Sequence, residues 1–150
     1  RLISLMLMAA GFSSFFGVGF LGDKFGGLQA LFIFSIIQAL FLGLLSVVDS
    51  LFAIYASAIL FGIGYGGILP CYPLIVREYL PAEQAGRRTA VVVFCGGAGM
   101  ALGGWMGGVI FDATGSYAMA FWIGVGFNLF NLIIVGNLIS RNKNQILAEA

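Results

Sequence analysis

The chain has 150 residues, of which 61% are hydrophobic and 9% are charged, with a formal net charge of +1 and a mean hydropathy of +1.06. Soluble domains carry roughly 25% charged residues, so this composition excludes an ordinary soluble domain and predicts an integral membrane protein. The small net charge gives no indication of nucleic-acid binding.

Charged residues divide the chain into five apolar segments, each near the roughly 20 residues that a helix needs to cross a bilayer core. We therefore expect an all-α fold, a polytopic membrane helix bundle. The first segment is too long for the apolar region of a signal peptide and has no small-residue cleavage site. Because the chain starts at Arg1 directly at a span, we expect it to be a piece of a longer protein. The five predicted transmembrane helices cover residues 2–21, 28–48, 51–76, 89–111 and 118–139.

Basic residues predict how these spans are oriented. Lys24, Arg77, Arg87, Arg88, Arg141 and Lys143 fall on one side of a five-span arrangement, and Arg1 falls on the other. The positive-inside rule then predicts a multi-pass protein of the cell membrane, with residues 140–150 as a cytoplasmic tail. Basic residues at the inner surface also favour contact with anionic membrane lipids, which are expected partners.

A glycine-rich charged loop joins the first two predicted spans. Its pattern Gly19-x-x-x-Asp23-x-x-Gly26 recurs 89 residues later as Gly108-x-x-x-Asp112-x-x-Gly115. The predicted topology places one copy in the cytoplasm and the other outside, with three spans between them. Three-span repeats of opposite topology are typical of secondary transporters.

This loop resembles the best-known signature of the major facilitator superfamily, Gly-x-Leu-x-Asp-Arg-x-Gly-Arg. Gly27 stands where that signature has its final basic residue. The segments 77–88 and 111–117 resemble a later cytoplasmic loop and the last outer turn of the family. The resemblance covers the whole chain and implies helices eight to twelve of a twelve-helix fold, with the missing N-terminal helices as partners. The matching residues are Gly19, Leu21, Asp23, Lys24 and Gly26.

Within the superfamily, the segment Gly99–Gly108 and the loop before it look most like the monocarboxylate and oxalate–formate type branch. This likeness implies secondary transport, by alternating access, of a small organic solute such as a monocarboxylate or another organic anion. Transport would be coupled to H+ or to a counter-substrate. A non-transporting membrane assembly or binding subunit is the alternative.

Ionisable residues are missing from the depth of every predicted span. Such residues mark proton relays and ion paths in membranes, so coupling groups are expected in the rest of the protein. The sequence also lacks a buried acid–base pair, a nucleophile–base pair, a metal-ligand cluster and a phosphate loop. It is therefore expected to be no enzyme and to hold no metal or cofactor.

Asp23 is predicted to lie where the first span ends. A carboxylate there meets the negative end of the helix dipole, so it needs a compensating partner such as Lys24. The family resemblance implies that Asp23 contacts a helix of the other half and latches one conformation, within a latch motif of Gly19, Asp23, Lys24 and Gly26. A helix-ending turn with Gly26 or Gly27 in a left-handed cap is the alternative.

The third predicted span contains prolines that remove backbone donors and displace the carbonyls of Gly66 and Leu69. Freed carbonyls at membrane depth require protein or water around them, which predicts a hinge and a cavity wall. The hinge residues are Gly66, Gly67, Pro70 and Pro73.

Four polar side chains are candidates for the substrate cavity. Tyr65 and Tyr72 are seven residues apart and share a helix face, which fits either substrate contact or aromatic packing. Ser13 and Ser14 lie near the middle of the first span, where a hydroxyl bonded to its own helix backbone is the alternative.

The other polar and small residues of the spans predict packing. Glycines 96, 99, 103 and 107, and glycines 97, 104 and 108, form two faces that predict two close helix neighbours, with Met100 and Trp105 in the core. Interhelical hydrogen bonds are predicted for Gln38, Asn128, Asn131 and Asn137. Cys71 and Cys95 are predicted to be buried free thiols.

Overall fold

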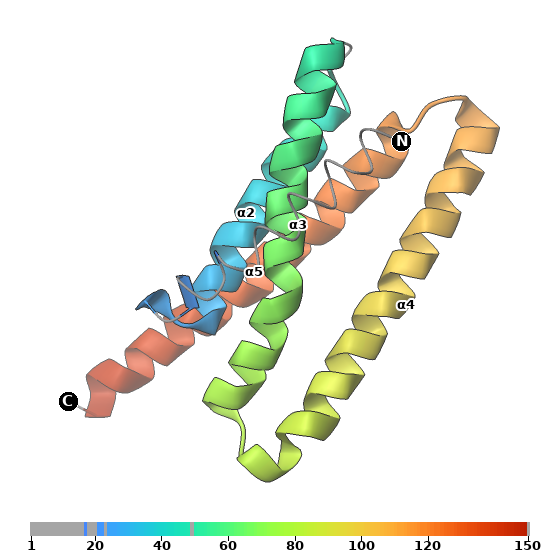
Figure 1. The fold of residues 1–150 in the computed structure, drawn as a ribbon. Helices are drawn as coiled ribbons and strands as arrows, with labels where there is room; N and C mark the ends of the chain where they lie inside the picture. Colours follow the sequence, from blue (N-terminus) through green and yellow to red (C-terminus); the bar gives the residue numbers. More distant parts are fainter. Residues whose placement is uncertain (1–16, 18–20, 23, 49, 150) are drawn as a thin grey trace.

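The computed structural model describes residues 17, 21–22, 24–48 and 50–149, with side chains described up to residue 142. This part of the chain is helical, which confirms the predicted all-α membrane bundle (Figure 1). The helices are α2 (Gly27–Leu45), α3 (Leu51–Tyr79), α4 (Ala82–Thr114) and α5 (Ala118–Glu149), and all four are long and apolar enough to cross a membrane. Most of the first predicted span lies outside the described residues, including Ser13 and Ser14.

Two segments that were predicted to lie outside the helices are helical in the structure. The charged segment 77–88 was expected to be a loop, but only Leu80 and Pro81 separate α3 from α4. The prediction was wrong because long charged side chains reach the water beside a membrane while their backbone stays helical. Likewise, α5 continues as a helix through the expected tail residues 140–149.

The charges gather at one end of the bundle. Helix α2 begins, α3 ends, α4 begins and α5 ends there (Figure 1). We call it the basic end, because it carries Lys24, Arg77, Arg87, Arg88 and Arg141. The opposite end carries Asp112 and the turn between α4 and α5. The charge sorting seen in the sequence is thus a property of the fold, and the cytoplasmic location of the basic end stays a prediction.

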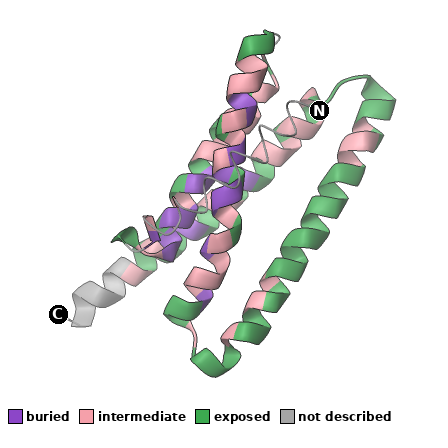
Figure 2. Ribbon diagram, viewed as in Figure 1, coloured by how far each residue is buried: buried purple, intermediate pink, exposed green. Residues whose placement is uncertain are grey.

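The buried core lies where α2 packs between α3 and α5 (Figure 2). Glycines of α3 permit a close approach to α2. A Cβ at Gly64 would lie 2.7 Å from the backbone nitrogen of Gln38, and a Cβ at Gly67 would overlap the ring of Phe34. Small residues at membrane helix contacts bring backbones together in this way. The core residues are Leu28, Ala30, Leu31, Phe34, Cys71 and Val135.

A polar seam joins α2 to α5 within the apolar bundle. The amide nitrogen of Asn128 donates to Gln38 Oε1 at 2.6 Å, and that of Asn131 donates to Ser35 Oγ at 3.1 Å. These bonds confirm the interhelical role predicted for three of the four residues, whereas Asn137 is exposed. Asn128 Oδ1 is buried without a donor among the described residues.

Helix α4 stands apart from this core. In the part of the chain that the structure describes, no residue of α4 is buried. A Cβ at Gly99 or Gly103 would meet no atom within 4 Å. The two close neighbours predicted for its glycine faces are therefore not among the described helices. Trp105 is 70% exposed and Met100 44%, so the prediction that they are core residues is wrong for this part of the protein. Cys71 is buried and free as expected, but Cys95 is exposed on α4.

Candidate functional site

The glycine loop before α2 turns the chain at Gly26. Lys24 and Phe25 are helical, and Gly26 then takes φ 86° and ψ 161°, a conformation that essentially only glycine adopts. The Gly26 N–H donates to the carbonyl of Gly22 at 2.8 Å, and its carbonyl accepts from Ala30 N–H at 3.1 Å. Gly26 thus ends one helical stretch and starts the next. Its ψ differs from that of the left-handed cap that the sequence left open as an alternative.

Two further glycines of the loop let it lie against α3. A Cβ at Gly22 would come within 2.5 Å of Leu74 Cδ2, and a Cβ at Gly27 would come within 2.8 Å of Ile75 Cγ1. Contacts this short would force the backbone or the neighbouring side chain to move. A basic side chain at Gly27, where the family signature has one, would require Ile75 to move.

Glu78 caps the N-terminus of α2. Both carboxylate oxygens of Glu78 lie 3.0 Å from the Gly27 nitrogen and accept its N–H. The N-cap residue Gly26 has no side chain to do this. A carboxylate at a helix N-terminus also gains from the positive end of the helix dipole. The last turn of α3 therefore fixes the position of the glycine loop.

Sequence reasoning missed Glu78 because it lies 51 residues from its partner. One signal was available: Gly26 precedes a long apolar helix and offers no capping oxygen, so the cap has to come from elsewhere. Glu78 is the acidic residue nearest the end of the next span on the same side.

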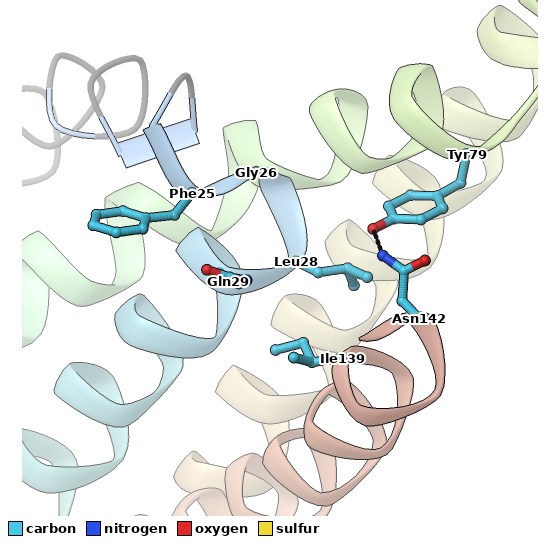
Figure 3. Close-up of a pocket in the computed structure, with 7 residues that line it drawn as sticks. All are labelled: Phe25, Gly26, Leu28, Gln29, Tyr79, Ile139 and Asn142. Carbon is cyan, nitrogen blue, oxygen red and sulfur yellow. Dashed lines mark hydrogen bonds between the residues drawn. The ribbon is translucent and has the colours of Figure 1, made fainter. Parts of the chain in front are cut away.

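A hollow of about 480 Å³ opens beside the loop at the basic end (Figure 3). Its polar rim includes Tyr79, whose hydroxyl oxygen accepts from the Asn142 amide at 2.8 Å and so ties α3 to α5. The ammonium of Lys24 lies 5.4 Å from the centre of the Phe25 ring. The lining residues are Phe25, Gly26, Leu28, Gln29, Tyr79, Ile139 and Asn142.

The predicted latch motif is described only in part. Gly19 and Asp23 lie outside the described residues, while Lys24 is exposed and Gly26 forms the turn. The contact between Asp23 and another half of the protein stays a prediction. What the structure adds is the contact of Glu78 with Gly27, which holds the described part of the loop against α3.

The two candidate cavity tyrosines have different surroundings. The Tyr65 hydroxyl donates to the Met100 sulfur at 2.9 Å, which links α3 to α4. Tyr72 is half-buried and packs against the core between α2 and α5. Neither residue lines the hollow of Figure 3, and contact with a substrate stays a prediction for both.

The predicted hinge lies inside an unbroken helix. Pro70 and Pro73 are both within α3, and the Cys71 thiol donates to the carbonyl of Gly67 at 3.0 Å. Gly66 and Gly67 are buried. The close contact of Gly67 with Phe34 shows that this glycine also serves helix packing, and bending at this place stays a prediction.

The second copy of the loop pattern ends at Gly115. This residue takes φ 70° and ψ 9°, the left-handed conformation, and its N–H donates to the Phe111 carbonyl at 2.7 Å. Tyr117 stacks on Phe111 with ring centres 4.4 Å apart. Gly26 and Gly115 are the two residues with positive φ in the part of the chain that the structure describes.

Comparison with known proteins gives one family. The model of the Major Facilitator Superfamily matches residues 2–148. Neither the curated proteins nor the solved structures include a match to the chain. The match covers nearly the whole sequence, including the glycine loop and its second copy.

Proposed function

Because the chain belongs to the Major Facilitator Superfamily, we propose that it forms part of a secondary transporter that moves a small organic solute by alternating access. The family consists of membrane transporters, which agrees with four apolar helices of membrane-spanning length and argues against an enzyme. The substrate class and the coupling to H+ or to a counter-substrate belong to the proposal.

One observation carries the alternating-access proposal. Gly26 and Gly115 occupy equivalent positions of the repeated pattern, and both have positive φ. Gly26 precedes the start of α2 and Gly115 follows the end of α4, and these two helix ends lie at opposite ends of the bundle (Figure 1). An inverted repeat places equivalent turns at opposite membrane surfaces. Such a pair of turns provides one contact region at each surface, one for the inward-open state and one for the outward-open state.

Within this proposal, the glycine loop acts as the latch of one state. Glu78 and the Gly27 N–H fix the loop against α3 at 3.0 Å, so that Asp23 and Lys24 can present charge to the other half of the transporter. Without this support the loop would lose the geometry on which a contact between the two halves depends. Asp23 is proposed as the contacting carboxylate.

The substrate is proposed to bind near Tyr65, Tyr72, Ser13 and Ser14, with α3 bending at the Gly66–Pro73 segment. The apolar spans provide no cation deep in the membrane to bind an organic anion, so that group is proposed to come from the rest of the protein. A monocarboxylate is the substrate class to test first.

Uptake into proteoliposomes tests this function. The full-length protein is reconstituted, and uptake of radiolabelled lactate, formate and oxalate is followed with and without a pH gradient. We expect saturable uptake of one of these solutes, with Tyr65→Phe or Tyr72→Phe raising the apparent KM several-fold. Asp23→Ala is expected to change the maximal rate, and uptake kinetics identical to those of the unsubstituted protein would remove the latch from the proposal.

The assembly-subunit alternative has one observation in its favour. The glycine faces of α4 are bare in the described structure and could pack against another protein. The same reconstitution decides between the two functions. If none of a broad panel of organic solutes is taken up by correctly folded, full-length protein, the transporter proposal is wrong and a stable complex with another membrane protein is expected.

A further inference from the structure

A second hollow at the basic end lies between the last turn of α3 and the first turns of α4, apart from the glycine loop. It has a volume of about 700 Å³. Its lining has a polar part with two arginines, which we call the polar side, and an aliphatic part, which we call the aliphatic side. The lining residues are Val76, Leu80, Gln84, Arg87, Arg88, Val91 and Val92.

The depth of the two arginines follows from the length of α4. The charge-free part of this helix, residues 89–111, is about 34 Å long at a rise of 1.5 Å per residue. That length matches a hydrocarbon core of roughly 30 Å. Arg87 and Arg88 therefore stand where the core ends and the headgroups begin, while Val91 and Val92 face the first part of the core.

The polar side of the hollow suits a phosphate group. Arg88 Nε donates to Gln84 Oε1 at 3.0 Å, a bond between side chains one helical turn apart that orients the guanidinium. That bond uses one of the five N–H donors of the guanidinium. A guanidinium presents paired donors that match two oxygens of a phosphate, and two adjacent arginines supply two such pairs.

The aliphatic side of the hollow selects among phosphate-bearing ligands. Val76 is buried and forms one wall, and Leu80, Val91 and Val92 continue the apolar surface toward the membrane core. A free inorganic anion gains nothing from these side chains. A ligand with a charged headgroup and a hydrocarbon chain can contact both the arginines and the aliphatic side chains. Basic pockets between membrane helices are known to bind anionic lipid headgroups.

We propose that this hollow is a binding site for one anionic phospholipid, with Arg87 and Arg88 on its phosphate and the valines against its upper acyl chains. The site does not depend on which solute the protein transports. It is distinct from the hollow beside the glycine loop, because the two share no lining residue. A lipid held here contacts α3 and α4, the two helices joined by Leu80 and Pro81.

Titration with a labelled lipid tests the proposal. Fluorescent phosphatidylglycerol is added to the full-length protein in micelles that contain phosphatidylcholine, and the apparent Kd is measured. Each arginine close to the bound headgroup is expected to contribute about a five-fold change in affinity, so Arg87→Gln with Arg88→Gln is expected to weaken binding by roughly 25-fold. Arg87→Lys with Arg88→Lys keeps the charge but not the paired donors, and an intermediate loss is expected.

Arg141→Gln is the matched control, because Arg141 is an exposed arginine at the same end and outside this hollow. We expect its Kd to change less than two-fold. An equal loss in Arg141→Gln would mean that binding reflects the general charge of the basic end and would overturn the site. Full competition by inorganic phosphate at millimolar concentration, or unchanged binding in the double glutamine variant, would overturn it as well. Thermal unfolding in phosphatidylcholine alone verifies that each variant is folded.

Discussion

Gly26 and Gly115 stand 89 positions apart in the sequence and at opposite ends of the bundle, and both have positive φ, 86° and 70°. Each donates its N–H to the carbonyl four residues earlier, Gly26 to Gly22 at 2.8 Å and Gly115 to Phe111 at 2.7 Å. In both copies a glycine with positive φ ends a helical stretch. The two glycines differ in ψ, 161° at Gly26 and 9° at Gly115, and in the part of the chain that the structure describes only the Gly26 turn lies against another helix.

Alanine at either turn glycine is expected to lower stability. A Cβ at positive φ is strained by about 1–3 kcal/mol, with the larger effect at Gly26, whose φ and ψ together are nearly exclusive to glycine. The measurement is thermal unfolding of the full-length protein in detergent. Gly126→Ala is the control, because Gly126 is in the interior of α5 with nothing within 4 Å of its Cβ position. It is expected to be neutral or to stabilise by about 0.5–1 kcal/mol. Equal effects at all three positions would contradict the interpretation.

Glu78→Ala is expected to loosen the start of α2. The substitution leaves the Gly27 N–H without its carboxylate partner, a loss typical of N-cap removal at about 0.5–2 kcal/mol. Hydrogen exchange of the α2 backbone amides measures this loosening, and faster exchange is expected at Gly27 and in the following turn. Glu78→Gln retains one accepting oxygen and should show a smaller effect. Glu83→Gln, at an exposed acidic residue in the first turn of α4, serves as the comparison and should leave exchange in α2 unchanged.

The hydrogen bond between Asn128 and Gln38 predicts a small but measurable coupling free energy between the two side chains. Asn128→Leu leaves Gln38 Oε1 without its donor at 2.6 Å, and Gln38→Leu leaves the Asn128 amide without its acceptor. Interhelical hydrogen bonds in membranes average about 0.6 kcal/mol, so a double-substitution cycle should give a coupling of that order. Unfolding in mixed micelles with increasing denaturing detergent supplies the free energies. Strictly additive single effects would show that the bond contributes nothing to stability.

Gly67→Ala is expected to separate α2 from α3. Its methyl group would overlap the Phe34 ring, and overpacking of this kind typically destabilises by about 1–3 kcal/mol. Combining it with Phe34→Leu should recover part of the loss, because the smaller side chain leaves room for the methyl group. The same unfolding assay measures both variants. Gly67→Ala with unchanged stability would show that the two helices are not in contact at this point in the membrane.

The amino-acid sequence alone predicts the fold class, four of the helices to within a few residues at most ends, and the sorting of charge to one end. These features follow from local physics, because a bilayer demands about 20 apolar residues per helix and excludes charge from its core. The repeated Gly-x-x-x-Asp-x-x-Gly pattern also predicted that Gly26 and Gly115 lie in turns between spans. It also identified Gln38, Asn128 and Asn131 as interhelical, because amides in hydrocarbon need partners.

The partner of each residue, by contrast, follows from how the helices pack and could not be predicted from the sequence. Glu78 on Gly27 and Gly67 against Phe34 both join positions whose sequence neighbours give no sign of the contact. The helical extent of segment 77–88 was misjudged because charge marks depth in the membrane and does not end a helix. The sequence also predicted two close neighbours for the glycine faces of α4, and the described helices do not supply them. Glycine spacing shows that another helix can approach closely, but it does not show which helix does so.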